Sequence, residues 1–291
     1  MSTSQDIAQF LTSRRARITP EQAGLPSYGE RRVPGLRREE VAALAGVGID
    51  YYRRLERGRV SGVSDSVLEA LARALQLDEA ERAHLFDLAR AVHPTVPRRR
   101  RPVQRRIRPA LQRVLDTMGA PALVGNWHFD FLAANRLGRA LYAPMFDSLE
   151  QPANSARFTF LDPAAVDFYP DWDTVADELV AHLRSVAGQF PHDRGLSELI
   201  GQLATRSAEF RTRWAAHNVR FHRTGTKRLR HPVVGELTVI YETMQLTTDE
   251  GLTMAVYTAE PGSASQQALD ILASWSATSD QANTASATDQ P

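Results

Sequence analysis

Residues 37–59 read RREEVAALAGVGIDYYRRLERGR, and this stretch restricts the possible folds of the chain more than any other. Apolar residues recur at helical spacing as far as Ala45, Gly46 interrupts them, and Tyr52 and Leu55 then continue the apolar face. Glycine adopts the positive φ of a tight turn without a steric cost. The pattern therefore predicts two short helices joined by a turn, with the first helix bracing the second.

The second helix of this pair is expected to run from about Gly48 to Arg57 and to end at Gly58, because glycine commonly terminates a helix. With its apolar side inward, this helix presents long polar side chains outward. The outward positions are Asp50, Tyr51, Arg53 and Arg54. Side chains of this kind can reach the base edges and the phosphates of a DNA duplex.

The same stretch resembles the Cro/repressor-like, or XRE, helix-turn-helix family of bacterial transcription regulators. The family pattern runs E-E-hydrophobic-A, then A-G-V, then R-L-E-x-G at the end of the recognition helix. The matching positions are Glu39, Glu40, Val41, Ala42, Ala45, Gly46, Val47, Arg54, Leu55, Glu56 and Gly58. The alternative is an unrelated pair of helices on a solvated surface.

The resemblance implies a DNA-binding site on the recognition helix and beside it. The implied DNA-contacting residues are Arg38, Gly48, Ile49, Asp50, Tyr51, Arg53, Arg54 and Arg57. Arg54 is the first candidate for a guanine contact, and Arg38 is expected near a phosphate. Asp50 either accepts a hydrogen bond from a cytosine amino group or stabilises the helix N-terminus. One such domain covers half of a site, so a homodimer on an inverted repeat of double-stranded DNA is expected.

The residues around this helix pair predict an all-α, five-helix domain over residues 1–93. Further helices are expected over residues 5–17, after Ser64 and after Asp78, each with an apolar face. Residues 19–35 contain three prolines and three glycines, and therefore predict a loop. This loop is longer than the usual link in the resembled family.

The resemblance also implies an ion pair inside this domain. In the family, an Arg near the end of the first helix pairs with the Glu of R-L-E-x-G. Here that pair is Arg14 or Arg15 with Glu56. A partly buried pair of this kind is structural, because breaking it leaves an uncompensated charge.

Charge is distributed unevenly along the chain. Residues 1–108 contain 21 Arg and 13 Asp or Glu, a balance of +8, and the remainder contains 14 Lys or Arg and 21 acids, a balance of −7. Only the basic part is expected to meet a polyanion. Residues 94–108 form a basic linker rich in Pro and Arg, which either follows the DNA backbone or acts as a solvated hinge.

Composition favours a cytoplasmic, nucleoid-associated protein of two domains. The 291 residues include no Cys, which suits a reducing compartment and excludes thiolate metal sites. No apolar run reaches the length of a membrane-spanning helix, and the N-terminus lacks the pattern of a signal peptide. No cofactor, metal or membrane partner is expected.

The second half predicts an α+β domain over residues 109–275. After a short helix, residues 122–131 alternate as in a strand, with an interruption near Gly125. Helices follow, and the last part is rich in strands, with a turn expected at residues 224–226, Thr-Gly-Thr. Residues 276–291 are polar and of low complexity, and are expected to be disordered. The expected fold is an antiparallel sheet with helical insertions.

This half resembles the ligand-binding domain of MmyB-like regulators. The shared motifs are W-A-x-H-x-V, H-P-V-V-G-x-L, a Y-E pair, Y-T-A-E-P-G-S and A-L-x-x-L-A-S-W. They stand at Trp214, Ala215, His217 and Val219, at His231–Gly235 and Leu237, at Tyr241 and Glu242, at Tyr257–Ser263, and at Ala268–Trp275. The resemblance implies a PAS-like fold around a pocket for a small apolar ligand, such as a fatty acyl compound.

Aromatic residues of this half are the candidates for the pocket, and Asn135 and His217 are the polar groups expected to orient the head of a ligand. The pocket candidates are Trp127, Phe129, Phe131, Asn135, Tyr142, Phe158, Trp214, His217, Phe221, Tyr241 and Tyr257. For each of them a plain structural role in the core is the alternative. His217 could also change its charge near neutral pH.

The sequence contains no phosphate-binding glycine loop, no metal-ligand spacing on a predicted helix and no nucleophile motif, so an enzyme is not expected. The stretches HFD at 128–130 and HDR at 192–194 only superficially resemble acid–base pairs, because adjacent strand residues point to opposite faces. The sequence thus favours a DNA-binding transcriptional regulator, a repressor by fold-level analogy, with a ligand-sensing second domain. The alternative is a second domain that serves only protein interaction or dimerisation.

Overall fold

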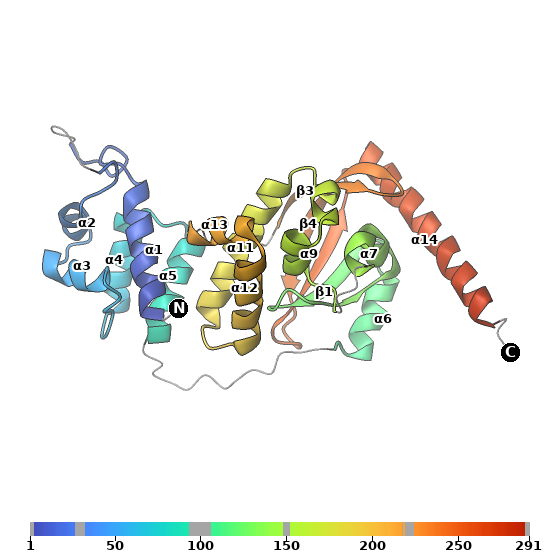
Figure 1. Cartoon of the computed structure of the whole chain (residues 1–291), viewed down its shortest axis with the longest axis horizontal. Helices are drawn as coiled ribbons and strands as arrows, with labels where there is room; N and C mark the ends of the chain where they lie inside the picture. Colours follow the sequence, from blue (N-terminus) through green and yellow to red (C-terminus); the bar gives the residue numbers. More distant parts are fainter. Residues whose placement is uncertain are drawn as a thin grey trace. The chain divides into compact units, whose positions relative to one another are not determined.

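The structure is a computed structural model that divides by its contacts into two compact units (Figure 1). It describes residues 3–26, 33–92, 106–147, 152–216, 218 and 224–288. Unit 1 contains residues 1–100, 180–197 and 211–221, and unit 2 contains residues 101–179, 198–210 and 222–291. Among the described residues, no helix is both long enough and apolar enough to cross a membrane.

Unit 1 is built from helices that share one apolar core. Its first five helices are α1 (Thr3–Arg17), α2 (Arg38–Leu44), α3 (Ile49–Leu55), α4 (Asp65–Ala74) and α5 (Glu79–Val92). Ile7, Phe10, Tyr52 and Leu85 are fully buried where these helices meet. The predicted five-helix arrangement is confirmed.

Local signals in the sequence fix where these helices begin and turn. Ser64 accepts a hydrogen bond from the backbone of Val67 and caps α4, and Asp78 does the same for Glu81 at the start of α5. Gly46 adopts a φ of +66° between α2 and α3, a value that residues with a side chain rarely adopt. The predicted recognition helix is therefore α3, slightly shorter at both ends than expected.

Unit 1 also includes chain segments from beyond the linker. They comprise the end of α11 (Trp172–Gln189) and most of α13 (Ala208–Ala215). Arg184 is almost fully buried there, with its guanidinium 4.0 Å from the ring centroid of Trp214. Burial lowers the pKa of Arg184 to about 10, while the negative charge of Asp6 on α1 opposes that shift. A domain boundary at residue 93 omits these segments, because composition does not reveal which distant segments pack together.

Unit 2 contains a five-stranded antiparallel sheet with helices around it, as predicted for an α+β domain. The strands are β1 (Ala122–Asn126), β2 (Phe131–Ala134), β3 (Thr224–His231), β4 (Gly235–Gln245) and β5 (Leu252–Thr258), in the order β2-β1-β5-β4-β3. The helices are α6 (Pro109–Thr117), α7 (Arg136–Leu141), α8 (Ala143–Phe146), α9 (Ser155–Leu161), α10 (Ala164–Phe168), most of α12 (Arg194–Arg206) and α14 (Ala264–Thr288).

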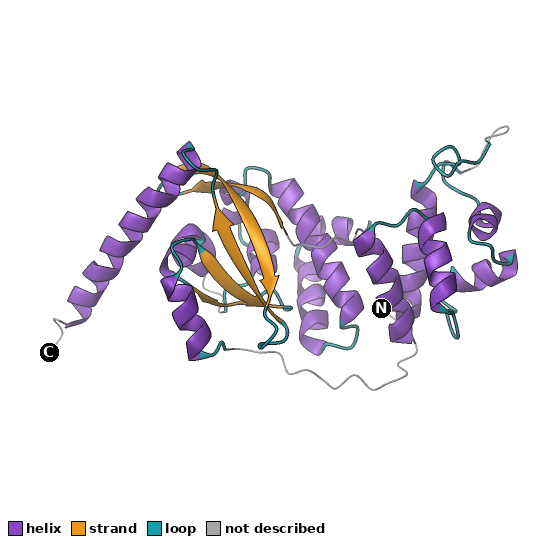
Figure 2. Ribbon diagram, turned by 180° about the vertical axis from the view of Figure 1, so that it is seen from behind, coloured by secondary structure: helices purple, strands orange, loops and turns teal. Residues whose placement is uncertain are grey.

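The sheet separates two apolar layers. On one face, helices α7 to α10 and the start of α14 cover inward side chains of the strands, including Leu229, Val239 and Tyr257. On the other face, Leu111 and Leu115 of α6 pack against the β1 end of the sheet. Figure 2 shows the strands from this second, more open side. The larger core of unit 2 therefore lies between the sheet and the helices α7 to α10.

One predicted strand and one predicted turn differ from the structure. Residues 122–131, expected as one interrupted strand, instead contain β1 and the hairpin turn that leads into β2 at Phe131. The predicted turn at residues 224–226 lies inside β3, and the chain turns between His231 and Gly235 instead. Gly225 suits the strand because a Cβ there would lie 2.7 Å from the hydroxyl of Tyr241 on the neighbouring strand.

The C-terminal segment also differs from the expectation. α14 continues to Thr288, so residues 276–288 are helical rather than disordered. The first part of α14 packs on the core through Ala268, Leu269 and Leu272. Once packing has formed the first part of α14, extending the helix requires no new nucleation. The composition of the polar tail alone does not reveal this effect.

Asn135 fixes the start of α7 against the sheet. Its Oδ1 accepts hydrogen bonds from the backbone of Ala122 (3.1 Å) and Gly138 (2.7 Å). Its Nδ2 donates to the carbonyls of Met118 (3.1 Å) and Ala120 (2.7 Å). All four hydrogen-bonding positions of this buried amide are therefore used by backbone groups.

We expect Asn135→Ala to lower the free energy of unfolding of unit 2 by about 3 kcal/mol, because it leaves several buried backbone groups without partners. Urea denaturation followed by tryptophan fluorescence measures this change. Thr117→Ala, at an exposed position near the end of α6, is the control and should change the stability by less than about 0.5 kcal/mol. Equal stabilities of the two variants would contradict the role assigned to Asn135.

Candidate nucleic-acid interface and ligand-binding core

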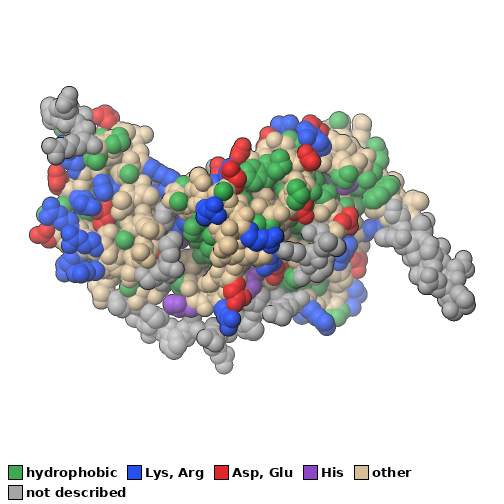
Figure 3. Space-filling view, viewed as in Figure 1, with side chains coloured by type: hydrophobic (Ala, Val, Ile, Leu, Met, Phe, Trp, Pro, Cys, Tyr) green, Lys and Arg blue, Asp and Glu red, His purple; other side chains and the backbone are tan. Residues whose placement is uncertain are grey.

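One side of helix α3 packs in the core of unit 1, and the other side faces solvent. Tyr52 and Leu55 are buried in the core of unit 1, as predicted. The predicted DNA-contacting residues are exposed or half-buried, namely Arg38, Gly48, Ile49, Asp50, Tyr51, Arg53, Arg54 and Arg57. Figure 3 shows basic side chains, all of them Arg, gathered over the end of unit 1 that carries α2 and α3. Unit 1 therefore leaves the outer side of α3 open to a partner.

Two further arginines lie beside these residues. Arg37 precedes α2 as its N-terminal flanking residue, and Arg59 follows Gly58 after α3; both are exposed. We call the exposed arginines of this region the cationic surface; they are Arg37, Arg38, Arg53, Arg54, Arg57 and Arg59. Arg37 and Arg59 could have been noticed in the sequence, because Arg37 adjoins the predicted contact Arg38 and Arg59 adjoins Gly58 of the motif.

A buried carboxylate positions the recognition helix. Glu56 follows α3, and its side chain is 2% exposed. It accepts a hydrogen bond from Nε of Arg15 on α1 at 2.6 Å and pairs with Arg38 of α2. Arg15 also donates to the carbonyl of Leu36 at 2.8 Å. Of the two alternatives for the predicted pair, Arg15 is the partner of Glu56, and Arg14 pairs with Glu81 at 3.0 Å.

The arginines on α2 and α3 differ in their surroundings. The carboxylate of Glu56 raises the pKa of Arg38. This ion pair uses part of the hydrogen-bonding capacity of the Arg38 guanidinium, which was expected to contact a phosphate. Arg53 lies 3.2 Å from the carboxylate of Asp50, one turn earlier on α3. Arg54 has no such carboxylate partner among the described residues, and its guanidinium lies 5.3 Å from the ring centroid of Tyr51. Arg54 thus differs from Arg38 and Arg53 in that no carboxylate of the described residues engages its guanidinium.

In unit 2, part of the predicted pocket set forms a continuous aromatic cluster. Tyr142 lies 5.3 Å from Tyr257 between ring centroids, and Tyr257 lies 6.2 Å from Tyr241. Phe131 approaches the ring of Tyr142 at 6.3 Å. Phe158 joins the same apolar core beside the helices α9 and α10. These five residues belong to the core between the sheet and the helices of unit 2.

Trp127 and Phe129 lie apart from that cluster, in the hairpin between β1 and β2. Phe129 adopts a φ of +66°, a strained value for a bulky residue. Trp127 packs against Gly251, where a Cβ would lie 1.8 Å from the indole ring. Both aromatic residues therefore shape the turns at this end of the sheet.

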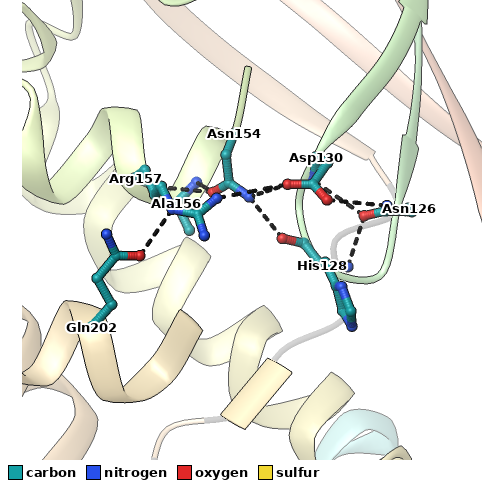
Figure 4. Close-up of polar contacts among 7 residues, drawn as sticks. All are labelled: Asn126, His128, Asp130, Asn154, Ala156, Arg157 and Gln202. Atoms are coloured by element: carbon teal, nitrogen blue, oxygen red, sulfur yellow. Dashed lines mark hydrogen bonds and ion pairs between the residues drawn. The ribbon is translucent and has the colours of Figure 1, made fainter. Parts of the chain in front are cut away.

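A polar network holds this hairpin in place (Figure 4). The amide oxygen of Asn126 accepts hydrogen bonds from the backbone of His128 and Asp130. Asn154 caps α9 with its oxygen and donates its amide to the carboxylate of Asp130 at 2.7 Å. Arg157 lies 3.8 Å from the same carboxylate and reaches Gln202 with its Nε. These contacts offset the strain at the tip of the hairpin.

The remaining predicted pocket residues have other positions. Asn135 was expected to orient a ligand head, but its amide is fully engaged by the backbone, so its role is structural. Trp214 belongs to unit 1, where its ring centroid lies 4.0 Å from the guanidinium of Arg184. His217 and Phe221 lie outside the described residues. The structure therefore brings together only part of the set, because periodicity along the chain does not distinguish one core from another.

The two superficial acid–base pairs are structural as well. Asp130 of the HFD stretch belongs to the hairpin network, and His128 contributes its backbone to it. Asp193 of the HDR stretch accepts a hydrogen bond from the backbone of Leu196 at 2.9 Å and so caps α12. Both carboxylates therefore help to hold the local backbone of the fold.

A helical unit with an exposed cationic recognition helix, in a chain with a separate α+β unit, defines a helix-turn-helix transcription regulator. Residues 6–85 match the family described as helix-turn-helix domain, and residues 107–272 match the MmyB-like transcription regulator ligand binding domain. The chain belongs to the MmyB-like transcription regulators. No curated protein matches it. Both matched families are regulator domains rather than enzyme families.

We expect Glu56→Gln to destabilise unit 1 by about 3 kcal/mol, because it leaves two arginines without their shared buried carboxylate. The variant should also bind DNA more weakly, since α3 loses its link to α1 and α2. Thermal unfolding and fluorescence anisotropy with labelled duplex DNA measure the two effects.

The matched control for this substitution is Glu69→Gln. Glu69 pairs with Arg82 at the surface of the same unit, and exposed pairs contribute little to stability. Its melting temperature and DNA affinity should stay close to those of the unchanged protein. If Glu56→Gln behaved like Glu69→Gln, the buried carboxylate would not position the recognition helix.

Proposed function

We propose that this protein is a cytoplasmic repressor that binds an inverted repeat of double-stranded DNA as a homodimer and responds to a small apolar ligand. The single observation that carries the DNA-binding part is the exposed outer side of α3 with its arginines. The repressor role follows from analogy with other helix-turn-helix regulators, in which occupancy of an operator blocks a promoter. An apolar ligand, for example a fatty acyl compound, suits the aromatic interior of unit 2.

The chemistry of α3 supports base reading as well as phosphate binding. Guanidinium groups donate paired hydrogen bonds to guanine, and Arg54 is the best placed for this contact. Ile49 is half-buried at the start of the helix and can meet a thymine methyl group. Asp50 pairs with Arg53, so its side chain limits the freedom of that arginine. The other arginines of the cationic surface supply sequence-independent attraction to phosphates.

Ligand control requires two states of the protein with different affinities for the ligand. The aromatic cluster of Tyr142, Tyr241 and Tyr257 gives unit 2 a place where an apolar molecule could bind. A ligand that binds one arrangement of the dimer more tightly shifts the population toward it, and so changes how well two recognition helices fit an operator. The linker of residues 94–108 joins the two functions in the chain.

A second role for unit 2 is dimerisation, and one observation favours it. Ile271 and Trp275 lie one turn apart on α14 and are 59% and 43% exposed. Large apolar side chains at this spacing form a continuous stripe on a helix. A second copy of the chain is a partner that would cover this stripe and bring two recognition helices together on one DNA site.

We expect Arg54→Ala to reduce affinity for the operator by about 5- to 150-fold, the effect of losing a paired guanine contact of about 1–3 kcal/mol. Affinity for random duplex DNA should fall far less. The operator is first selected from a random library with the unchanged protein, and anisotropy titrations then compare both DNAs. Arg90→Ala, an equal charge loss at an exposed position of α5, is the control. Unchanged discrimination by Arg54→Ala would contradict base readout.

We expect Ile271→Asp to shift the protein toward monomers and to weaken operator binding at least tenfold, since an inverted repeat requires two linked copies. Sedimentation velocity over a range of protein concentrations measures the association. Val166→Asp places the same charge at another exposed apolar position, on α10, and should leave the association unchanged. A dimer of unaltered stability in Ile271→Asp would exclude α14 as the interface.

A further inference from the structure

Part of the chain that matches the ligand-binding family packs with the DNA-binding helices. The family match covers residues 107–272, yet residues 180–197 and 211–221 belong to unit 1. Helix α11 is one continuous helix, and its residues up to 179 belong to unit 2 while those from 180 onward belong to unit 1. A rigid helix can carry a displacement along its length. We therefore asked what the end of α11 contacts inside unit 1.

Gly188, near the end of α11, lies directly against His84 of α5. A Cβ at position 188 would lie 2.6 Å from Nδ1 of His84, closer than such atoms approach in proteins. His84 is buried, and its ring packs edge-on against Phe10 of α1 with ring centroids 5.2 Å apart. The imidazole therefore has little room to move aside. Glycine stabilises a helix less than alanine does, and this close contact accounts for its presence here.

One turn earlier on the same side of α11, the buried Arg184 joins two other elements of unit 1. Its guanidinium lies against the ring of Trp214 and donates a hydrogen bond to the carbonyl of the same residue. The carboxylate of Asp6 on α1 attracts it, and the positive charge of Arg184 opposes the rise in the pKa of Asp6 that burial causes. Within the described part of the chain, Nε of Arg184 has no hydrogen-bond partner. Charge and the aromatic ring therefore hold this contact together.

The end of α1 contacts the chain that follows α13. Arg17 is the last residue of α1, and its guanidinium donates hydrogen bonds to the carbonyl of Ala216 at 3.1 Å and to the side-chain oxygen of Asn218. Asp6 interacts with α11 near the beginning of the same helix. Segments from the ligand-binding match therefore hold α1 near both of its ends.

These contacts are mainly polar, whereas helices α1 to α5 share an apolar core of their own. Polar contacts of this kind are typical of interfaces that form and release while both sides stay folded. The docked state leaves the outer side of α3 exposed, so DNA can reach it. It also fixes α1, whose Arg15 holds Glu56 beside α3. Release of the contacts would therefore loosen the recognition helix rather than uncover it.

We propose that Arg184, Gly188, Trp214, Ala216 and Asn218 form a releasable docking surface for α1 and α5, by which the ligand-binding half of the chain controls how firmly the recognition helix is held. Docking favours operator binding, and release weakens it. The residues of the docking surface are positioning residues, because they act on DNA only through α1 and α5. The inference goes beyond the proposed function, since it holds for any signal that displaces α11, whichever ligand causes it.

Two substitutions in the full chain test this role. Arg184→Met removes the buried charge, and Gly188→Ala forces α11 away from α5. We expect each to lower affinity for the selected operator at least tenfold in anisotropy titrations, and to speed amide exchange in α1, measured by hydrogen-exchange mass spectrometry. The matched controls are Arg136→Met, at an exposed position of α7, and Gly201→Ala, where α12 has open space for a Cβ. Both measurements should stay unchanged in the controls.

A reversible cross-link separates loss of docking from damage to the fold. The chain contains no Cys, so an introduced pair is the only one. A Cβ at position 188 would lie 3.8 Å from Cγ of His84, so His84→Cys with Gly188→Cys brings two sulfur atoms within reach of a disulfide after a small shift, and loss of the imidazole makes room for the new side chain. In a chain that also carries Arg184→Met, oxidation should restore operator affinity to within threefold of the unchanged protein and slow exchange in α1. Reduction should reverse both effects.

The outcomes separate the docking surface from DNA binding itself. Unchanged operator affinity in both Arg184→Met and Gly188→Ala, a cysteine pair that does not oxidise, or affinity that stays low in the cross-linked chain would each overturn the docking surface and leave DNA binding standing. Faster exchange in α1 with full operator affinity would show a purely structural contact and would also overturn it. If the unchanged protein selects no operator from the random library, the proposed function fails, and the docking surface loses its role with it.

Discussion

The buried carboxylate of Glu56 is the constraint on which the DNA-binding unit depends. It follows the recognition helix and joins Arg15 of α1 and Arg38 of α2 in a single charged cluster. A charge at such a position is stable only when its partners stay in place, so the three elements cannot move independently without a large cost. The direction in which α3 faces is therefore set by one carboxylate in the interior, although the arginines proposed to meet DNA lie on the surface.

Unit 2 uses its interior differently. Its sheet carries an aromatic layer in which several tyrosines place polar hydroxyls among apolar rings, and one lysine borders that layer. Burial raises the pKa of both the Tyr142 and the Tyr257 phenols, and the two hydroxyl groups lie close enough to influence each other. The strained hairpin at Phe129, in contrast, is fully supported by the network around Asn154 and serves the fold.

Where prediction from sequence failed, the missing information was a contact with a distant residue. Thr-Gly-Thr at 224–226 has the composition of a turn, but Gly225 is needed because Tyr241 crosses over it on the next strand. Trp214 belongs to a recognised motif of the ligand-binding domain, yet it packs with Arg184 in the other unit. Asn135 was correctly expected to begin a helix, but only the structure shows that four backbone groups use its amide completely.

The sequence by itself determined the helix pair, its glycine turn, the caps at Ser64 and Asp78, the outward arginines and the α+β class of the second half. These features depend on residues within one or two turns of each other, where spacing and residue type decide the local structure. Only the tertiary structure decided that Arg15 rather than Arg14 meets Glu56, which aromatic residues share one core, and that Lys227 borders the tyrosines. Such pairings join residues far apart in the chain, and the packing of whole elements, which no local pattern encodes, selects among them.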